Sequence, residues 1–178
     1  MKKREKKDWF EEGLRVLADE GFQKITINHL CSLLQITQGS FYHHFKNIDG
    51  YIEALMEYWW QKNTVAFIKA TEALPGIAEK GALLNDMVAS ASLKAEQVIR
   101  AWSFSNETVR CILRQVDNMR VEYLTGLNIQ SGITPEDALR YALLEYGTLI
   151  GLEQLCPDLP KEEFRRMYQI YSTNMYKP

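Results

Sequence analysis

Two short helical patterns lie between Thr26 and Lys46, and only Gln35 and Ile36 separate them. In the first pattern, apolar residues recur at i, i+3, i+4 and i+7, the spacing of one helix face: Ile27, Leu30, Cys31 and Leu34. A threonine precedes each pattern, at Thr26 and Thr37. Its hydroxyl can cap a helix by accepting a hydrogen bond from a free backbone N–H. The segment therefore predicts two short helices packed across a tight turn.

The second helix is expected to be about two turns long, too short to add much to a core. Its inward residues are expected to be Phe41 and Phe45, and the other positions cannot all face inward as well: Gln38, Gly39, Ser40, Tyr42, His43 and His44. In a helix-turn-helix, the N-terminal part of the second helix meets base edges of DNA while flanking groups hold phosphates. This pattern is therefore interpreted as a DNA-reading helix. The alternative is a pair of packed helices with an ordinary polar surface.

Gln38 and Ser40 are the expected base readers. Glutamine can bind adenine through two hydrogen bonds, and serine can bind bases or phosphates. Gly39 costs a helix about 1 kcal/mol relative to alanine, which indicates that the backbone approaches DNA or the neighbouring helix closely there. The helix contains no Lys or Arg, so no arginine–guanine contact predicts the operator.

The residues from Thr26 to Lys46 resemble the DNA-binding signature of the tetracycline-repressor (TetR) family of bacterial regulators. The matching parts are a capping threonine, an apolar pair, a short turn, a second cap, a small-residue pair and an aromatic run: Thr26, Leu30-Cys31, Ile36, Thr37, Gly39-Ser40, Phe41, Tyr42-His43-His44-Phe45 and Lys46. The preceding helix matches as well, through Phe10, Leu14, Leu17, Ala18 and Gly21-Phe22. Gln35 and Cys31 stand where the signature usually has Gly and Ala. Gln35 is expected to alter the turn, because Gly reaches positive φ more easily.

The resemblance implies an all-α regulator with a helix-turn-helix DNA-binding domain at residues 1–47 and a helical ligand-binding and dimerisation domain at residues 48–178. It implies DNA contacts at eight positions: Thr26, Thr37, Gln38, Gly39, Ser40, Tyr42, His43 and Lys46. Tyr42, His43 and Lys46 would mainly hold the DNA backbone. In the family, the last two helices of each subunit form the interface of a homodimer. The operator is therefore expected to be near-palindromic, and a small-molecule effector is expected to release a repressor from it.

Beyond Lys46 the sequence contains helical patterns and no convincing strand alternation. One long helix is expected to begin near Ile48 and end at Leu74-Pro75-Gly76, with others around 83–101 and 106–128. Thr134 and Pro135 predict a further helix start, by capping and by proline at the first helical position. The last two helices have apolar stripes: Leu139, Ala142, Leu143, Tyr146, Leu149 and Ile150 in one, and Phe164, Met167, Tyr168, Tyr171 and Met175 in the other. Such stripes also fit the closed core of a monomer, and only the resemblance favours a dimer interface.

Aromatic residues are frequent after the first domain, and six of them are candidate ligand-binding residues: Trp59, Trp60, Phe67, Trp102, Tyr123 and Tyr141. The resemblance implies that a bound effector shifts the spacing of the two DNA-binding heads, which requires it to bind one conformation better. The alternative is that these residues belong to a core, as aromatic residues at helical spacing more often do. The charges nearby, Glu96 with Arg100 and Asp117 with Arg120, are explained by surface ion pairs.

The net charge of −2 is unevenly distributed over the 178 residues. Residues 1–46 contain eight Lys or Arg and six Asp or Glu, a formal charge of +2, whereas the remainder contains thirteen and seventeen, a charge of −4. Five basic residues lie at the N-terminus: Lys2, Lys3, Arg4, Lys6 and Lys7. A flexible basic arm can add phosphate or minor-groove contacts. A solvated start that aids solubility is the alternative.

Other protein classes are disfavoured. Three widely spaced cysteines favour a reducing cytosol over a disulfide framework or a zinc site, and no run of about 18 apolar residues predicts a membrane span. No phosphate loop, dinucleotide fingerprint, nucleophile elbow or zinc-protease motif occurs. We therefore expect a cytoplasmic non-enzyme without metal or cofactor. Two alternatives stay open: a helical ligand-binding or scaffolding protein that has lost DNA binding, and a small all-α enzyme using Glu or Asp in the aromatic cavity.

Overall fold

The computed structural model describes residues 5–91, 93–156, 159–163, 165–167 and 170. All regular secondary structure in these residues is helical, which confirms the predicted all-α class. The chain forms two compact units. Unit 1 comprises Met1–Lys62 and Ser92–Asp117, and unit 2 comprises Asn63–Ala91 and Asn118–Pro178.

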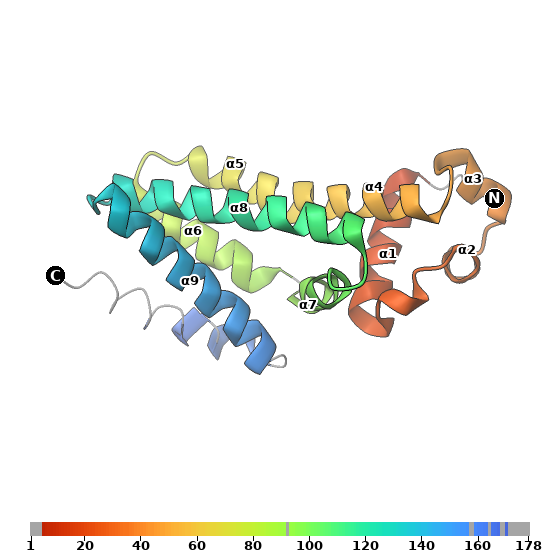
Figure 1. Ribbon diagram of the computed structural model, residues 1–178. Coiled ribbons are helices and arrows are strands. Elements are labelled where there is room, and N and C mark those ends of the chain that lie inside the picture. Colours follow the sequence, from red (N-terminus) through yellow and green to blue (C-terminus); the bar gives the residue numbers. More distant parts are fainter. Residues whose placement is uncertain (1–4, 92, 157–158, 164, 168–169, 171–178) are drawn as a thin grey trace. The chain divides into compact units, whose positions relative to one another are not determined.

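Unit 1 contains the N-terminal helices and a later part of the chain (Figure 1). Its elements are α1 (Lys6–Glu20), the 3-10 turn η1 (Phe22–Lys24), α2 (Ile27–Leu34), α3 (Gln38–His44), α4 (Ile48–Trp60), α7 (Leu93–Trp102) and the start of α8 (Glu107–Gln130). Helix α1 packs against α2, α4 and α7, and α2 packs against α3. Helix α1 is therefore the element around which unit 1 is built.

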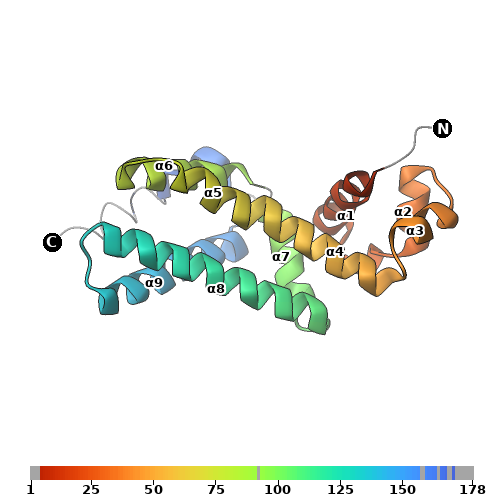
Figure 2. The ribbon, with the colours of Figure 1, turned by 90° about the horizontal axis from the view of Figure 1, so that it is seen from above.

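Unit 2 contains the remaining helices (Figure 2). A π-helical turn, η2 (Gln61–Val65), crosses the boundary between the units, and α5 (Ala66–Glu72), α6 (Ile77–Ser90), the rest of α8 and α9 (Pro135–Leu155) follow. Helix α5 packs against α6. Residues 161–163 and 165–167 are also helical.

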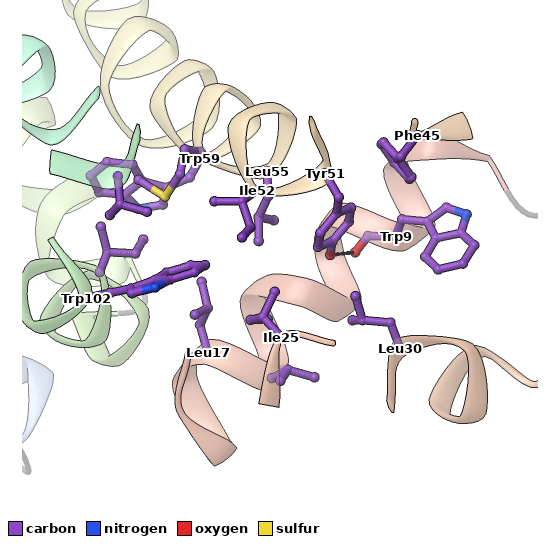
Figure 3. Packing of buried hydrophobic residues seen from close by; sticks show 14 of the residues in the cluster. Trp9, Leu17, Ile25, Leu30, Phe45, Tyr51, Ile52, Leu55, Trp59 and Trp102 are labelled. Carbon is purple, nitrogen blue, oxygen red and sulfur yellow. Dashed lines mark hydrogen bonds between the residues drawn. The ribbon is translucent and has the colours of Figure 1, made fainter. Parts of the chain in front are cut away.

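The core of unit 1 is rich in large side chains. Trp9, Tyr51, Leu55 and Trp59 are each at most 2% exposed, and they come from α1 and α4. In Figure 3 the hydroxyl of Tyr51 donates a hydrogen bond of 2.8 Å to the backbone carbonyl of Trp9. Because burial of apolar surface is the main stabilising contribution to folding, this core fixes α1 against α4.

Two of the three predicted threonine caps are confirmed, whereas Thr37 stands at the N-cap position of α3 without a side-chain capping hydrogen bond. The hydroxyl of Thr26 accepts a hydrogen bond of 3.3 Å from the backbone N–H of His29 at the start of α2. Thr134 caps α9 in the same way, accepting from Asp137 N–H, and Pro135 occupies the first helical position. The caps determine where these helices begin.

The single helix predicted around residues 83–101 is wrong. Helix α6 ends at Ser90 and α7 begins at Leu93. The apolar spacing is helical on both sides of the break, but α6 packs against α5 in unit 2 whereas α7 packs against α1 in unit 1. Tertiary packing therefore interrupts a pattern that is continuous in the sequence.

The domain boundary predicted after residue 47 concerns function and stays a prediction. By compactness, α4 and α7 group with the N-terminal helices in unit 1. Several predicted features lie outside the described residues: the basic residues Lys2, Lys3 and Arg4, the loop residues Pro157 and Asp158, and Phe164, Tyr168, Tyr171 and Met175 of the last stripe. Within the described residues, no helix is both long and apolar enough to cross a membrane.

Candidate nucleic-acid interface

Helix α3 is anchored by two phenylalanines, as predicted. Phe41 is fully buried and Phe45 is 5% exposed. The ring centroid of Phe41 lies 5.4 Å from that of Trp9, and the ring centroid of Phe45 lies 5.0 Å from that of Tyr51. Edge-to-face aromatic packing of this kind adds about 0.5–1.5 kcal/mol per pair beyond burial. A helix of only seven residues is thus held in one orientation by α1 and α4.

The turn between α2 and α3 closes without glycine. Gln35 has φ 56° and ψ 48°, the left-handed conformation. The N–H of Gln35 donates to the carbonyl of Ser32, and the N–H of Ile36 donates to the carbonyl of Cys31, at 3.2 and 3.0 Å. These are the two hydrogen bonds of a Schellman motif. Gln35 therefore adopts the left-handed conformation that Gly favours, and the expected alteration of the turn by Gln35 is not observed.

The outward face of α3 is polar and exposed. Gln38, Gly39, Tyr42, His43 and Lys46 are exposed, and Tyr42 is 55% exposed despite its aromatic ring. Thr26 and Thr37, at the starts of α2 and α3, are exposed too, and Ser40 is half-buried. The eight predicted DNA-contact residues thus lie on α2, α3 and their ends, and their contact with DNA stays a prediction.

Gly39 has open space around it. A Cβ atom at this position would have the hydroxyl of Thr37 as its nearest neighbour, at 3.6 Å, which is ordinary van der Waals contact. No neighbouring helix among the described residues requires glycine there. Of the two reasons considered for Gly39, close packing of α2 against α3 is therefore not supported.

Two contacts at this surface were missed by sequence reasoning. The side-chain amide of Gln38 donates a 2.5 Å hydrogen bond to the side-chain carbonyl of Asn28 in α2. The ammonium of Lys6 lies 5.8 Å from the ring centroid of Phe45, a cation–π contact that brings the start of α1 to the end of α3. No sequence signal predicts the Asn28–Gln38 pairing, since the two residues are ten positions apart on different helices.

The sequence of this region matches a family. Residues 10–55, from α1 into α4, match the family of bacterial regulatory proteins named tetR. This segment is similar to the tetR family. The matched segment contains all of α2 and α3, so the candidate interface lies within the part of the chain that is similar to this family.

Solved structures extend the likeness to the rest of the fold. A TetR transcriptional regulator from Legionella pneumophila has a TM-score of 0.78 at 14% identity, covering 94% of this chain and 97% of that chain. A transcriptional regulator from Rhodococcus sp. Rha1 has a TM-score of 0.78 at 17% identity, covering 94% and 93%. A proposed transcriptional regulator from Saccharomonospora viridis, in complex with choline, has a TM-score of 0.74 at 13% identity, covering 93% and 94%. At these identities the likeness shows the fold alone, and no curated protein matches the chain.

The six candidate ligand-binding aromatics fall into both units. Trp59 and Trp102 are 2% and 5% exposed in the core of unit 1, and Trp60 packs against that core. In unit 2, the hydroxyl of Tyr123 lies 2.6 Å from that of Thr71, and Phe67 and Tyr141 are half-buried. Core packing accounts for Trp59 and Trp102 without a ligand, and the assignment of all six to a ligand site stays a prediction.

The charged groups form contacts more buried than surface ion pairs. Within unit 1, Arg100 of α7 donates hydrogen bonds to Glu96, at 2.8 Å, and to Asp117 of α8, at 2.9 and 3.1 Å. The side chain of Arg100 is 14% exposed and that of Glu96 is 10% exposed. In unit 2, Arg120 donates to the hydroxyls of Thr64 and Tyr146, both at 3.0 Å. The interior of unit 2 is therefore partly polar.

Helix α9 has apolar residues on both a buried and an exposed face. Ala138, Ala142 and Tyr146 are buried inside unit 2, whereas Leu139 and Leu143 are 47% and 53% exposed. Gly147 is exposed one turn further along, and a Cβ atom there would meet nothing within 4 Å. Large apolar side chains gathered on an exposed face are a feature of interaction surfaces.

Proposed function

We propose that this protein is a DNA-binding transcriptional regulator whose α3 reads bases in the major groove. The observation that carries the proposal is the division of α3 into two faces, with Phe41 and Phe45 buried and the polar face exposed. A helix anchored in this way presents fixed side chains to DNA, as a helix-turn-helix requires. Because it acts on chromosomal DNA, we place the protein in the cytoplasm.

Within this proposal the eight residues have two roles. Gln38 and Ser40 contact base edges, since amide and hydroxyl groups can read them. The others position the helix on the DNA backbone: Thr26, Thr37, Gly39, Tyr42, His43 and Lys46. The exposure of Lys46 and Tyr42 at the end of α3 supports contacts to phosphate oxygens.

Binding to DNA can be tested at several salt concentrations. The wild-type protein is mixed with a library of randomised duplexes, the bound duplexes are sequenced, and the affinity for the selected duplex is measured by fluorescence anisotropy. Lys46→Ala should weaken binding to every sequence and reduce the slope of log affinity against log salt by about 0.9, the value for one lost phosphate contact. Lys69→Ala, which removes an exposed lysine of α5, is the matched control and should leave the slope unchanged. Failure of the wild type to select any sequence would refute the proposal.

We further propose that the protein binds a near-palindromic operator as a homodimer formed through its last two helices. The exposed leucines of α9, Leu139 and Leu143, support an interface between copies of the chain. In such a dimer the two copies of α3 would meet half-sites about 34–36 Å apart. Two inverted copies of one short motif in the selected duplexes are the expected result.

We also propose that the regulator is a repressor and that a small-molecule effector, bound in unit 2, releases it from DNA. The partly polar interior of unit 2, around Arg120, Thr64 and Tyr146, supports a site with hydrogen-bonding groups. The S. viridis regulator was solved with choline, so choline is the first compound to test. A rise in the midpoint of thermal unfolding together with loss of DNA binding would identify an effector. Increased transcription from the operator after deletion of the protein would establish repression.

A further inference from the structure

Two exposed amide side chains meet at the front of the helix-turn-helix. Asn28 is the second residue of α2 and Gln38 is the first residue of α3. The Nε2 atom of Gln38 donates a hydrogen bond of 2.5 Å to Oδ1 of Asn28. The backbone under each residue is held in place, because Thr26 caps α2 and the turn at Gln35 closes through two hydrogen bonds.

The hydrogen bond determines which polar atoms of Gln38 remain available. An amide nitrogen has two hydrogens and an amide oxygen has two acceptor sites. One hydrogen of Nε2 is used by Asn28, so one N–H donor and the whole Oε1 acceptor are left for DNA. The major-groove edge of adenine offers an acceptor, N7, beside a donor, the N6 amino group, whereas guanine offers two acceptors. One donor beside one acceptor is the arrangement that adenine matches.

We propose that Asn28 is a positioning residue that fixes the orientation of the Gln38 amide and thereby sets a preference for adenine at one position of the operator. This inference rests on the proposed function, since it assumes that α3 reads DNA. Asn28 acts through Gln38: its carbonyl accepts only from the nitrogen end of the amide. The amide of Gln38 is therefore turned with its oxygen away from Asn28 before DNA is bound.

A simpler possibility is that Asn28 and Gln38 each contact DNA separately and that their hydrogen bond is broken on binding. The two cases differ in additivity. If Asn28 acts only through Gln38, its removal has no effect on base preference once Gln38 is gone. If each residue reads its own base, the two substitutions change the preference independently.

The test measures base preference rather than affinity alone. Binding to randomised duplexes first identifies the operator position at which the wild type prefers adenine and the Gln38→Ala variant does not. Dissociation constants are then measured for a duplex with adenine at that position and for one with guanine, using the wild type, Asn28→Ala, Asn28→Asp, Gln38→Ala and the double variant Asn28→Ala/Gln38→Ala. A glutamine–adenine pair gives the wild type an expected preference of about 5- to 150-fold.

The expected pattern has three parts. Asn28→Ala reduces the adenine preference to within about twofold of that of Gln38→Ala. The double variant has the same preference as Gln38→Ala. Asn28→Asp keeps the wild-type preference, because a carboxylate oxygen accepts from Nε2, while its negative charge lowers the affinity for both duplexes. Gln115→Ala, which removes an exposed amide of α8, is a control and should change neither quantity.

Several outcomes would overturn the inference. One is that Asn28→Ala keeps the wild-type preference for adenine. Another is that Asn28→Ala lowers this preference by the same factor in the wild type and in the Gln38→Ala variant. Loss of the preference in Asn28→Asp with full folding would also contradict a role for the acceptor oxygen. Because Asn28 is exposed, the unfolding midpoints of the variants should match that of the wild type. A wild type that selects no DNA sequence refutes the proposed function as well, so the two failures are distinguishable.

Discussion

Gln35 adopts the left-handed backbone conformation, which residues other than glycine rarely adopt. A side chain in the left-handed conformation costs roughly 1–2 kcal/mol, because its Cβ approaches the following carbonyl oxygen. Glycine avoids this cost but loses about 0.5–1 kcal/mol through the greater freedom of the unfolded chain. Gln35→Gly should therefore stabilise the protein by about 0.5–1 kcal/mol, measured by urea unfolding.

The matched control for this substitution is Gln115→Gly. Gln115 lies inside α8, where the backbone is helical, and glycine in a helix costs about 1 kcal/mol. We expect Gln35→Gly to raise the free energy of unfolding and Gln115→Gly to lower it. Equal destabilisation would mean that the strain at Gln35 is relieved elsewhere.

Gly13 in α1 is required by packing rather than by backbone conformation. A Cβ atom at this position would lie 2.1 Å from the hydroxyl oxygen of Tyr51 and 3.1 Å from two methyl groups of Leu55. Gly13→Ala should therefore destabilise unit 1 by about 1–3 kcal/mol, the usual cost of overpacking a core, despite the higher helix propensity of alanine. The measurement is the free energy of unfolding in urea.

Tyr51→Phe provides the second half of a double-mutant cycle with Gly13→Ala. Alone it removes the hydrogen bond to Trp9, at a cost of about 1 kcal/mol. It also removes the oxygen closest to the new Cβ, so Gly13→Ala should destabilise the Tyr51→Phe variant less than the wild type. Additive effects would show that Leu55, not Tyr51, limits the space.

At the scale of elements, Glu11 of α1 links this helix to Tyr58 of α4 and to Lys62 of η2. The carboxylate of Glu11 accepts a hydrogen bond from Tyr58 and two of 2.9 Å from Lys62. Burial raises the pKa of Glu11, but these hydrogen bonds and the charges of Lys62 and Lys7 lower it by more, so the pKa lies below its usual value. Burial, together with the hydrogen bond to Glu11 and the negative charge of Glu11, raises the pKa of Tyr58 to about 12.

The lowered pKa of Glu11 determines how the stability of the protein changes with pH. The folded protein binds this proton more weakly than the unfolded chain, so the stabilisation is complete above the unfolded pKa of 4.5 and is lost as pH falls through the lower folded pKa. Glu11→Gln should therefore lower the free energy of unfolding at pH 7 and have less effect near pH 3. Urea unfolding at both pH values measures this, with Glu57→Gln, an exposed acid of α4, as a comparison. An equal effect at both pH values would show that the charge of Glu11 is unimportant.

Helix starts were predictable, and helix interruptions were not. Thr26 and Thr134 predicted the starts of α2 and α9 because capping is local chemistry. The break after Ser90 and the π-helical turn at Gln61–Val65 depend on contacts made by distant residues. In the π-helical turn, for example, Arg120 donates to the hydroxyl of Thr64, a partner 56 positions away.

At the scale of the whole molecule, apolar spacing predicted the all-α class and the inward residues of α3. The same spacing cannot distinguish a core from a pocket, because both are lined by large apolar side chains. Trp59 and Trp102 illustrate this, since their burial in unit 1 explains their presence without a ligand. The pairing of Asn28 with Gln38 was out of reach because a hydrogen bond between helices leaves no periodic signal.

The proposed dimer gives the last prediction, which concerns affinity for a complete operator. Leu139 and Leu143 of α9 are exposed and four positions apart, so they lie on one face of the helix. Replacing both by Glu places charges on that face and should convert a dimer to a monomer, measured by light scattering after size-exclusion chromatography. Phe104→Glu puts the same charge on an apolar residue of unit 1 that is 88% exposed, and it should leave the molecular mass unchanged.

Loss of the dimer should affect binding to the complete operator and binding to a single half-site differently. Two linked reading helices bind a two-half-site duplex more tightly than one, by about 10²- to 10⁴-fold when the spacing fits. The Leu139→Glu/Leu143→Glu variant should lose this factor on the complete operator and keep the wild-type affinity for a single half-site, since α3 is distant from α9 in the sequence and belongs to another unit. A monomeric wild type, or a variant that still binds the complete operator at full affinity, would rule out α9 as the element that joins the two copies.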